Sequence, residues 1–246
     1  GNKITSATTG NEALGSTTGT AGNSILLGDG MSIAGAGTPN SGANITYDGG
    51  GVVSNVAADL VIQNSQGNVA TAGDQSLNSV TADATIGGDV ESLNGGSINV
   101  SSNRIAAATT GNNASNAIAT GEATGAFAAS VAVANQQTND HTHLGASNTN
   151  SQIGAIIGFG GAANADSVSV TGNTTAANAY GSQVSQSVAL EANSVSLGAS
   201  PVILTGGAGP QGHVVTSGAA TVSNLQSRYD SSVTATNSDS DIPLLS

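Results

Sequence analysis

The stretch "NRIAAATTGNNASNAIA" at residues 103–119 decides the fold, because a close copy of it, "NKITSATTGNEALGS", stands at residues 2–16. The matched positions are Asn2 with Asn103, Lys3 with Arg104, Ile4 with Ile105, Gly10 with Gly111, Asn11 with Asn112, and Ala13 with Ala114. Internal repetition of this kind indicates a structural unit that recurs and buries its apolar face against neighbouring copies.

A third and more divergent copy lies in "SVSVTGNTTAANAYGSQVSQSVAL" at residues 167–190. Its matches to the second copy are Asn173 with Asn103, Gly181 with Gly111, Gln186 with Asn116, and Val188 with Ile118. We therefore expect a β-strand repeat domain over residues 1–230, with copies near 1–16, 97–119 and 167–190.

The composition favours an ordered chain with a thin core. Only 7% of the residues are charged and 2% are aromatic, whereas an ordinary globular domain has about 25% charged residues. Disordered segments combine high charge with low hydrophobicity, but 37% of this chain is hydrophobic. Ala, Ser, Thr, Asn, Gly and Val fill the sequence, so closely stacked sheets suit it better than a core of large side chains.

The charge excludes several functions. The net charge is −12 and only three residues are Lys or Arg, so the chain lacks the basic clusters that bind nucleic acid or an anionic bilayer. The most apolar run, residues 153–163, is shorter than the roughly 20 residues of a membrane-spanning helix. There are no cysteines, which excludes disulfides, thiolate metal sites and a cysteine nucleophile.

Short β-branched runs between Gly, Asn and Asp predict an all-β fold. Examples are residues 23–28, 58–64, 96–102 and 166–172. The Ala-rich residues 125–137 are the best candidate for a helix, although their "SVAVA" portion alternates as a strand does. We expect a β-solenoid (β-helix) of short stacked strands, with a β-sandwich as the alternative. Layers of roughly 20 residues would give about 12 layers and a rod of about 60 Å.

The shared "TTGN" predicts a turn, because Gly and Asn both tolerate the left-handed backbone region. Each copy would then be a strand–turn–strand unit. Its asparagines, Asn103, Asn112 and Asn116 in the second copy, would lie at corners and bond to neighbouring layers.

The spacing of Asn, Gly-Asn and Asn or Gln among small and β-branched residues resembles curlin-type repeats. It also resembles the longer Asn/Gly-rich β-strand repeats of bacterial surface proteins, including the holdfast-anchor type. The resemblance implies a secreted, self-associating or surface-anchored structural protein in adhesion. A second stretch, residues 115–135, is similar to the heads of trimeric autotransporter adhesins.

One motif suggests chemistry. In "DHTH", His141 and His143 would share a face of an extended strand beside Asp140, and two imidazoles with a carboxylate can hold Zn²⁺ or Ni²⁺. The simpler interpretation is a polar loop between Asn- and Gln-rich flanks, so we expect no metal and no cofactor. There is no G-x-S-x-G elbow and no phosphate-binding loop, and we expect no enzymatic activity.

The C-terminal residues 231–246 predict an assembly device. A strand-like segment precedes Asn103 and Asn173 but not Asn2. The sequence "SVTA" at 232–235 matches this missing segment, and its Val233 and Ala235 would share one face of a strand. We expect this segment to be donated to the first repeat of a neighbouring subunit, because an unpaired edge strand invites pairing.

The sequence thus favours a structural subunit of a secreted bacterial fibre or cell-surface anchor in adhesion or biofilm, assembled head to tail. The alternative is a monomeric or trimeric β-solenoid adhesin that binds glycans, extracellular polysaccharide or other surface proteins. The residues expected to carry assembly are Asn2, Ile4, Gly10, Asn11, Asn103, Ile105, Gly111, Asn112, Asn116, Asn173, Gly181, Val233 and Ala235.

Overall fold

The computed structural model describes most of the chain. The described residues are 1–14, 22–27, 33–34, 45–46, 53–56, 58–70, 73–90, 95–120, 124–157, 167–195, 202–205, 215–218, 220–242 and 244–245. They form strands and turns and contain no helix, so the prediction of an all-β fold is confirmed. No stretch of them is a helix with the length and hydropathy needed to cross a membrane. Of the apolar run at 153–163, residues 158–163 lie outside the described part.

The chain passes three times around one circuit, and each pass makes one layer. The first layer contains β1 (Lys3–Ala13), β2 (Asn23–Leu27), β3 (Ile33–Ala34), β6 (Leu60–Val69), β7 (Gln75–Ala82), β8 (Thr85–Val90) and β9 (Ser97–Ser101). The second contains β10 (Arg104–Thr120), β11 (Thr124–Ala128), β12 (Val131–Asp140), β13 (Thr142–Thr149), β14 (Gln152–Ile157) and β15 (Ser167–Thr171). The third contains β16 (Thr174–Ala189), β17 (Ala192–Val195), β20 (Ala220–Tyr229), β21 (Ser232–Ser238) and β22 (Leu244–Leu245).

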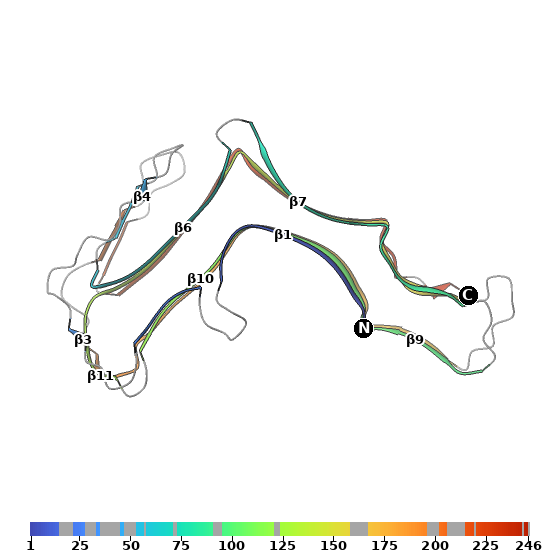
Figure 1. Cartoon of the computed structure of the whole chain (residues 1–246), viewed down its shortest axis with the longest axis horizontal. Coiled ribbons are helices and arrows are strands. Elements are labelled where there is room, and N and C mark those ends of the chain that lie inside the picture. Colours follow the sequence, from blue (N-terminus) through green and yellow to red (C-terminus); the bar gives the residue numbers. More distant parts are fainter. Residues whose placement is uncertain are drawn as a thin grey trace.

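Corresponding strands of the three layers pair in parallel, with the second layer in the middle. Figure 1 looks along the short axis, so the layers overlie one another and the circuit appears as two facing arms. One arm holds β1, β10 and β16, and the other holds β6 and β7 with the strands stacked on them.

The register of the stack follows the sequence repeat. Lys3 pairs with Arg104, which pairs with Thr174, and Asn11 pairs with Asn112 in the same alignment that the sequence suggested. The expected layer of about 20 residues is wrong, however. Bonded side chains in adjacent layers are 101, 70, 71 or 89 residues apart, so each layer is a long circuit and the described strands form only three layers.

The prediction of a turn at "TTGN" is also wrong, because β10 is a single strand of 17 residues that includes this segment. A Cβ on Gly111 would meet the carbonyl oxygen of Gly181 and, at 2.6 Å, Oδ1 of Asn139 from the facing arm. Glycine is needed here for the close approach of a side chain to the backbone, and not for a turn. Asn112 and Asn116 therefore lie within a strand instead of at corners, whereas Asn103 lies in the break between β9 and β10, directly after the left-handed Ser102.

The corners use left-handed residues that stack in columns. Between the strands of the second arm, His141 and Asp230 occupy equivalent positions with φ of 49° and 41°, and Gly73, with φ of 83°, belongs to the longer connection of the first layer at the same corner. Asp83, Asn150 and Asp239 form the next corner, with φ of 51°, 50° and 51°. Asp and Asn tolerate this region better than most residues, which explains how each layer turns at the same place.

Apolar side chains fill only parts of the space between the arms. Ile118, Phe127, Val131 and Val133 are fully buried in one cluster, which Ile62 completes. A second small cluster joins Ile86, Ile105 and Ile153. The remaining interior is polar, which a stack of strands can accommodate because its layers satisfy one another's amides.

A small antiparallel sheet interrupts the circuit. It contains β4 (Ile45–Thr46), β5 (Val53–Val56), β18 (Val202–Thr205) and β19 (Val215–Gly218), which come from the first and third passes. It contacts β12 and β20 on the outside of the second arm. Every residue of β12 is buried, including its outward-facing positions. The Ala-rich stretch at 125–137 forms β11 and most of β12, so it is strand and not helix.

Candidate functional site: amide columns and open layer edges

Two columns of amides run through the three layers of the second arm. In the asparagine column, Asn64 donates to Asn135 over 2.6 Å and Asn135 donates to Asn224 over 2.8 Å. The donors therefore all point from the first layer toward the third. Asn224 is exposed, and its Nδ2 has no acceptor within the described chain, so the column ends with a donor that faces solvent.

The glutamine column (Gln66, Gln137 and Gln226) has the opposite polarity. Gln226 donates to Gln137 over 2.9 Å, and Gln137 donates to Gln66 over 2.7 Å. Gln137 is fully buried and uses its second hydrogen for the backbone oxygen of Gln183 on the facing arm, at 2.9 Å. The two columns together give the stack a direction.

The sequence reasoning missed both columns. Their signal is the pattern N-x-Q-x-N at residues 64–68 and 135–139, which becomes N-x-Q-x-R at 224–228. The pattern has period 2, as expected for one face of a strand, and its three occurrences could have been aligned as a second repeat. Read without this alignment, residues 135–139 look only like a polar flank of the histidine motif.

Four asparagines from both arms form a central asparagine cluster, in which Asn11 and Asn112 of one arm interdigitate with Asn68 and Asn139 of the other. Asn11 donates to both Asn112 and Asn68 over 2.9 Å. Asn68 donates to Asn139 over 2.9 Å, and Asn139 reaches the backbone oxygen of Gly181. Three of the four side chains are buried, and their mutual bonds offset the cost of desolvation.

The repeat asparagines at the start of each copy bond backbone as well as side chain. Oδ1 of Asn103 accepts the backbone N–H of Asn2 at 2.7 Å, and Oδ1 of Asn173 accepts that of Asn103 at 3.0 Å. Asn116 differs, because it accepts from Asn23 while its own Nδ2 is buried without a partner. Its counterpart Gln186 bonds instead to backbone oxygens of the second arm.

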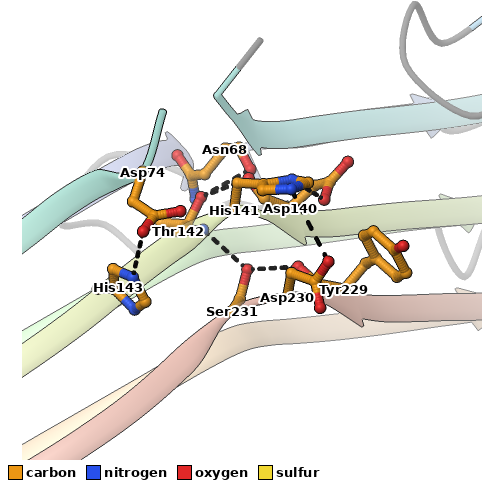
Figure 2. Close-up of polar contacts among 9 residues, drawn as sticks. All are labelled: Asn68, Asp74, Asp140, His141, Thr142, His143, Tyr229, Asp230 and Ser231. Carbon is orange, nitrogen blue, oxygen red and sulfur yellow. Dashed lines mark hydrogen bonds and ion pairs between the residues drawn. The ribbon is translucent and has the colours of Figure 1, made fainter. Parts of the chain in front are cut away.

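The histidine motif lies at the corner between β12 and β13 and joins all three layers (Figure 2). Nε2 of His143 is 3.1 Å from Oδ2 of Asp74 in the first layer, and its Nδ1 is 2.7 Å from Oγ of Ser232 in the third. His141 lies 2.7 Å from Asp140 and 3.8 Å from Asp230.

The same corner does not form the candidate metal site. His141 has the left-handed backbone of the corner, so it and His143 turn to different partners and do not share a face with Asp140. Among the described residues, no three His, Cys, Asp or Glu side chains are grouped to hold a metal ion. The contacts observed here tie the layers together at an exposed corner.

The outer edges of the stack are open. Among the described residues, strands β1, β6 and β7 of the first layer pair only with the second layer, and β16, β20 and β21 of the third do the same. The large hydrophobic side chains that stay exposed in the described chain are Ile4, Leu14, Leu26, Val80, Tyr180, Val195, Val222, Tyr229 and Ile242. All of them belong to the first or third layer.

The C-terminal strand lies elsewhere than the sequence match suggested. In β21, Ser232 pairs with His143 and Val233 with Leu144, so the strand continues the third layer on top of β13. The match with the strand before Asn173, which is β15, is not used. Ala235 pairs with Ala146 and is exposed on the open edge.

Comparison with protein-family models, with curated proteins and with solved structures finds no match to this chain.

Proposed function

We propose that this chain is a structural subunit of a secreted bacterial fibre or cell-surface anchor that acts in adhesion or biofilm. Its fold would be a β-solenoid with three long turns, and its subunits would associate head to tail through β-strand pairing. The observation that carries the proposal is the pair of layer edges that stay open in the described chain, formed by strands paired on one side only: β1, β6 and β7 at one edge and β16, β20 and β21 at the other. Proteins normally cover, interrupt or use such edges.

The distribution of exposed apolar side chains supports assembly. Ile105 in the second layer is fully buried, whereas its first-layer partner Ile4 is 38% exposed. Val133 is fully buried, whereas its third-layer partner Val222 is 49% exposed. Stacking another layer on either edge would remove this apolar surface from water, which is the main favourable term in association.

The proposed role involves no catalysis and no cofactor. The buried polar side chains, such as Asn112, Gln137 and Asn139, bond to one another or to backbone oxygens of the facing arm. Amides arranged in this way act as interlayer bonds and have no group that could transfer a proton. The proposed extracellular location rests on the composition, because a chain with three Lys or Arg residues offers few sites to trypsin-like proteases.

Electron microscopy tests the proposal directly. Purified protein, concentrated alone in physiological salt, should form filaments, and aligned filaments should diffract at about 4.7–4.8 Å along the fibre axis. A protein that stays monomeric at millimolar concentration would contradict the proposal.

A second candidate function is binding of a polysaccharide by the monomer. A shallow groove of ≈ 280 Å³ lies on the sheet formed by β7, β13 and β21. The groove is lined by small side chains that expose mainly apolar surface in it, and the lining residues are Asn78, Ser79, Val80, Gly145, Ala146, Ser147, Thr234 and Thr236. Retention of the monomer on an immobilised polysaccharide, lost in Thr234→Ala/Thr236→Ala, would favour this function over assembly.

A further inference from the structure

We infer that the filament has one fixed junction, in which the third layer of one copy lies on the first layer of the next with β16 on β1, β20 on β6 and β21 on β7. This inference rests on the proposed function and specifies its partner, polarity and register. Two features of the two open edges lead to it: the polarity of the amide columns and the termination of the apolar columns. The charge at one corner opposes it and predicts how salt should affect assembly.

The amide columns make the two edges complementary. The third-layer edge presents the free donor of Asn224 and the carbonyl oxygen of Gln226, which accepts from no described residue. The first-layer edge presents the opposite groups at the same strand positions, the carbonyl oxygen of Asn64 and the amide nitrogen of Gln66.

Both first-layer groups can form a further hydrogen bond. Oδ1 of Asn64 accepts one bond, at 3.3 Å from Asn23, and an amide oxygen has two lone pairs. Nε2 of Gln66 donates to the backbone oxygen of Asn113 at 3.0 Å and carries a second hydrogen. A head-to-tail junction therefore extends both columns in their existing directions, whereas two like edges bring donor to donor in the glutamine or asparagine column.

The apolar columns select the same register. The column Ile62–Val133 ends at Val222, which is 49% exposed, and the junction would place Val222 on Ile62 of the next copy. The column Leu77–Leu144 ends at Val233, and the same shift places Val233 on the next Leu77. A slip of one residue would put these side chains on the opposite face of the strand.

One corner opposes the junction. The corner column runs Asp83, Asn150, Asp239, and in it Asn150 donates to Asp83 over 2.5 Å. At the proposed junction Asp239 lies directly over Asp83 of the next copy, so two carboxylates replace the Asn–Asp contact. Assembly should consequently be slowed at low ionic strength and helped by screening.

Cysteine cross-linking tests the junction, since the native chain has no cysteine. Val80 and Thr236 are exposed, face outward and belong to one column, with Ser147 between them. Within one copy they are two layers apart, but at the proposed junction they are one layer apart, within the Cα separation of about 4.4–6.8 Å that a disulfide spans.

The experiment mixes copies that carry Val80→Cys with copies that carry Thr236→Cys, and oxidises them under filament-forming conditions. The inference predicts a disulfide-linked dimer in the mixture, at least ten times more abundant than with either variant alone. Ser76→Cys mixed with Ser232→Cys is the second in-register pair, and Val80→Cys mixed with Ser232→Cys is the out-of-register control, since Ser232 and Ser76 share a column.

The outcomes separate this inference from the proposed function. Filaments in which neither in-register pair cross-links, or in which a variant cross-links with itself, would overturn the junction and leave the fibre proposal standing. Absence of filaments from the unmodified chain would overturn both.

Discussion

The middle layer and the two outer layers have similar sequences in their repeat copies but different environments. Ile105 of the middle layer is fully buried, whereas Ile4 at the equivalent position is 38% exposed. The difference arises because a side chain in a stack is covered mainly by its neighbours above and below. The contribution of a given residue type to the free energy of unfolding therefore depends on its layer. A side chain in an outer layer would contribute as much as one in the middle layer only when another copy covers it.

The largest expected effect comes from the layer contrast itself. Ile105→Ala should lower the free energy of unfolding by about 3–4 kcal/mol, because it opens a cavity in a fully buried cluster. Ile4→Ala should cost about 1 kcal/mol in the monomer, in proportion to its partial exposure. Chemical denaturation of the monomer measures both, and equal losses would contradict the contrast.

A methyl group at Gly111 should be nearly as damaging. Gly111→Ala places a Cβ 2.6 Å from Oδ1 of Asn139 and against the backbone of Gly181, which should cost about 2–3 kcal/mol through overpacking. Gly73→Ala is the matched control in an outer layer, since its Cβ would meet nothing within 4 Å and only its φ of 83° opposes alanine. The control should cost about 1 kcal/mol, measured by the same unfolding curves.

The glutamine column gives a sharper version of the comparison. Gln137→Ala leaves Gln226 without its acceptor and Gln66 without its donor, and should cost about 2 kcal/mol. Gln226→Ala removes a single bond at an outer edge and should cost about 0.5–1 kcal/mol in the monomer. If Gln226→Ala were the more damaging change, the middle layer would not be the most constrained one.

Asn150 and Asp239 occupy the same corner in adjacent layers, so exchanging the residue type tests the corner repulsion. Asp239→Asn should increase the rate of filament elongation about threefold at low salt, corresponding to about 0.7 kcal/mol, because it removes a like-charge contact at the junction. Light scattering or seeded growth measures the rate. The gain should disappear above about 0.5 M salt, and a gain that persists there would indicate a cause other than charge.

The smallest effect is expected at the histidine corner. His143→Ala removes the contact with Asp74, but the two side chains are 44% and 58% exposed, so the loss should stay below about 1 kcal/mol. His143→Gln, which keeps a hydrogen-bonding group beside Ser232, should be nearly neutral. Thermal unfolding of the two variants checks this, and a loss above 2 kcal/mol would assign the corner a larger role than its geometry supports.

The register of the stack could be predicted from sequence because identical residues stack on one another. The match of Asn11 with Asn112 is a physical pairing as well as an alignment, since the two amides bond directly. The same alignment contains the length of a layer, because matched asparagines are 101 and 70 residues apart and each interval is one complete circuit. The prediction of about 20 residues per layer is wrong because it assumes further, divergent copies between the recognisable ones.

The glycine of "TTGN" was misjudged for a different reason. Gly111 is required by a side chain from the facing arm, Asn139, and a contact between arms has no trace in the local sequence. The corners were equally hidden, because Asp83, Asn150 and Asp239 differ in type while sharing a backbone conformation. The N-x-Q-x-N pattern, in contrast, is visible in the sequence alone, because its polar residues alternate along one face of a strand.

The small antiparallel sheet has a consequence for the appearance of a polymer. Its strands come from the first and third passes, for instance where Leu204 pairs with Val56, so it occurs once per copy on one side of the circuit. Stacked copies would carry this projection at every third layer, a spacing of about 14 Å. Averaged images should therefore show an asymmetric filament with a regular series of projections along one edge. The number of projections would equal the number of molecules.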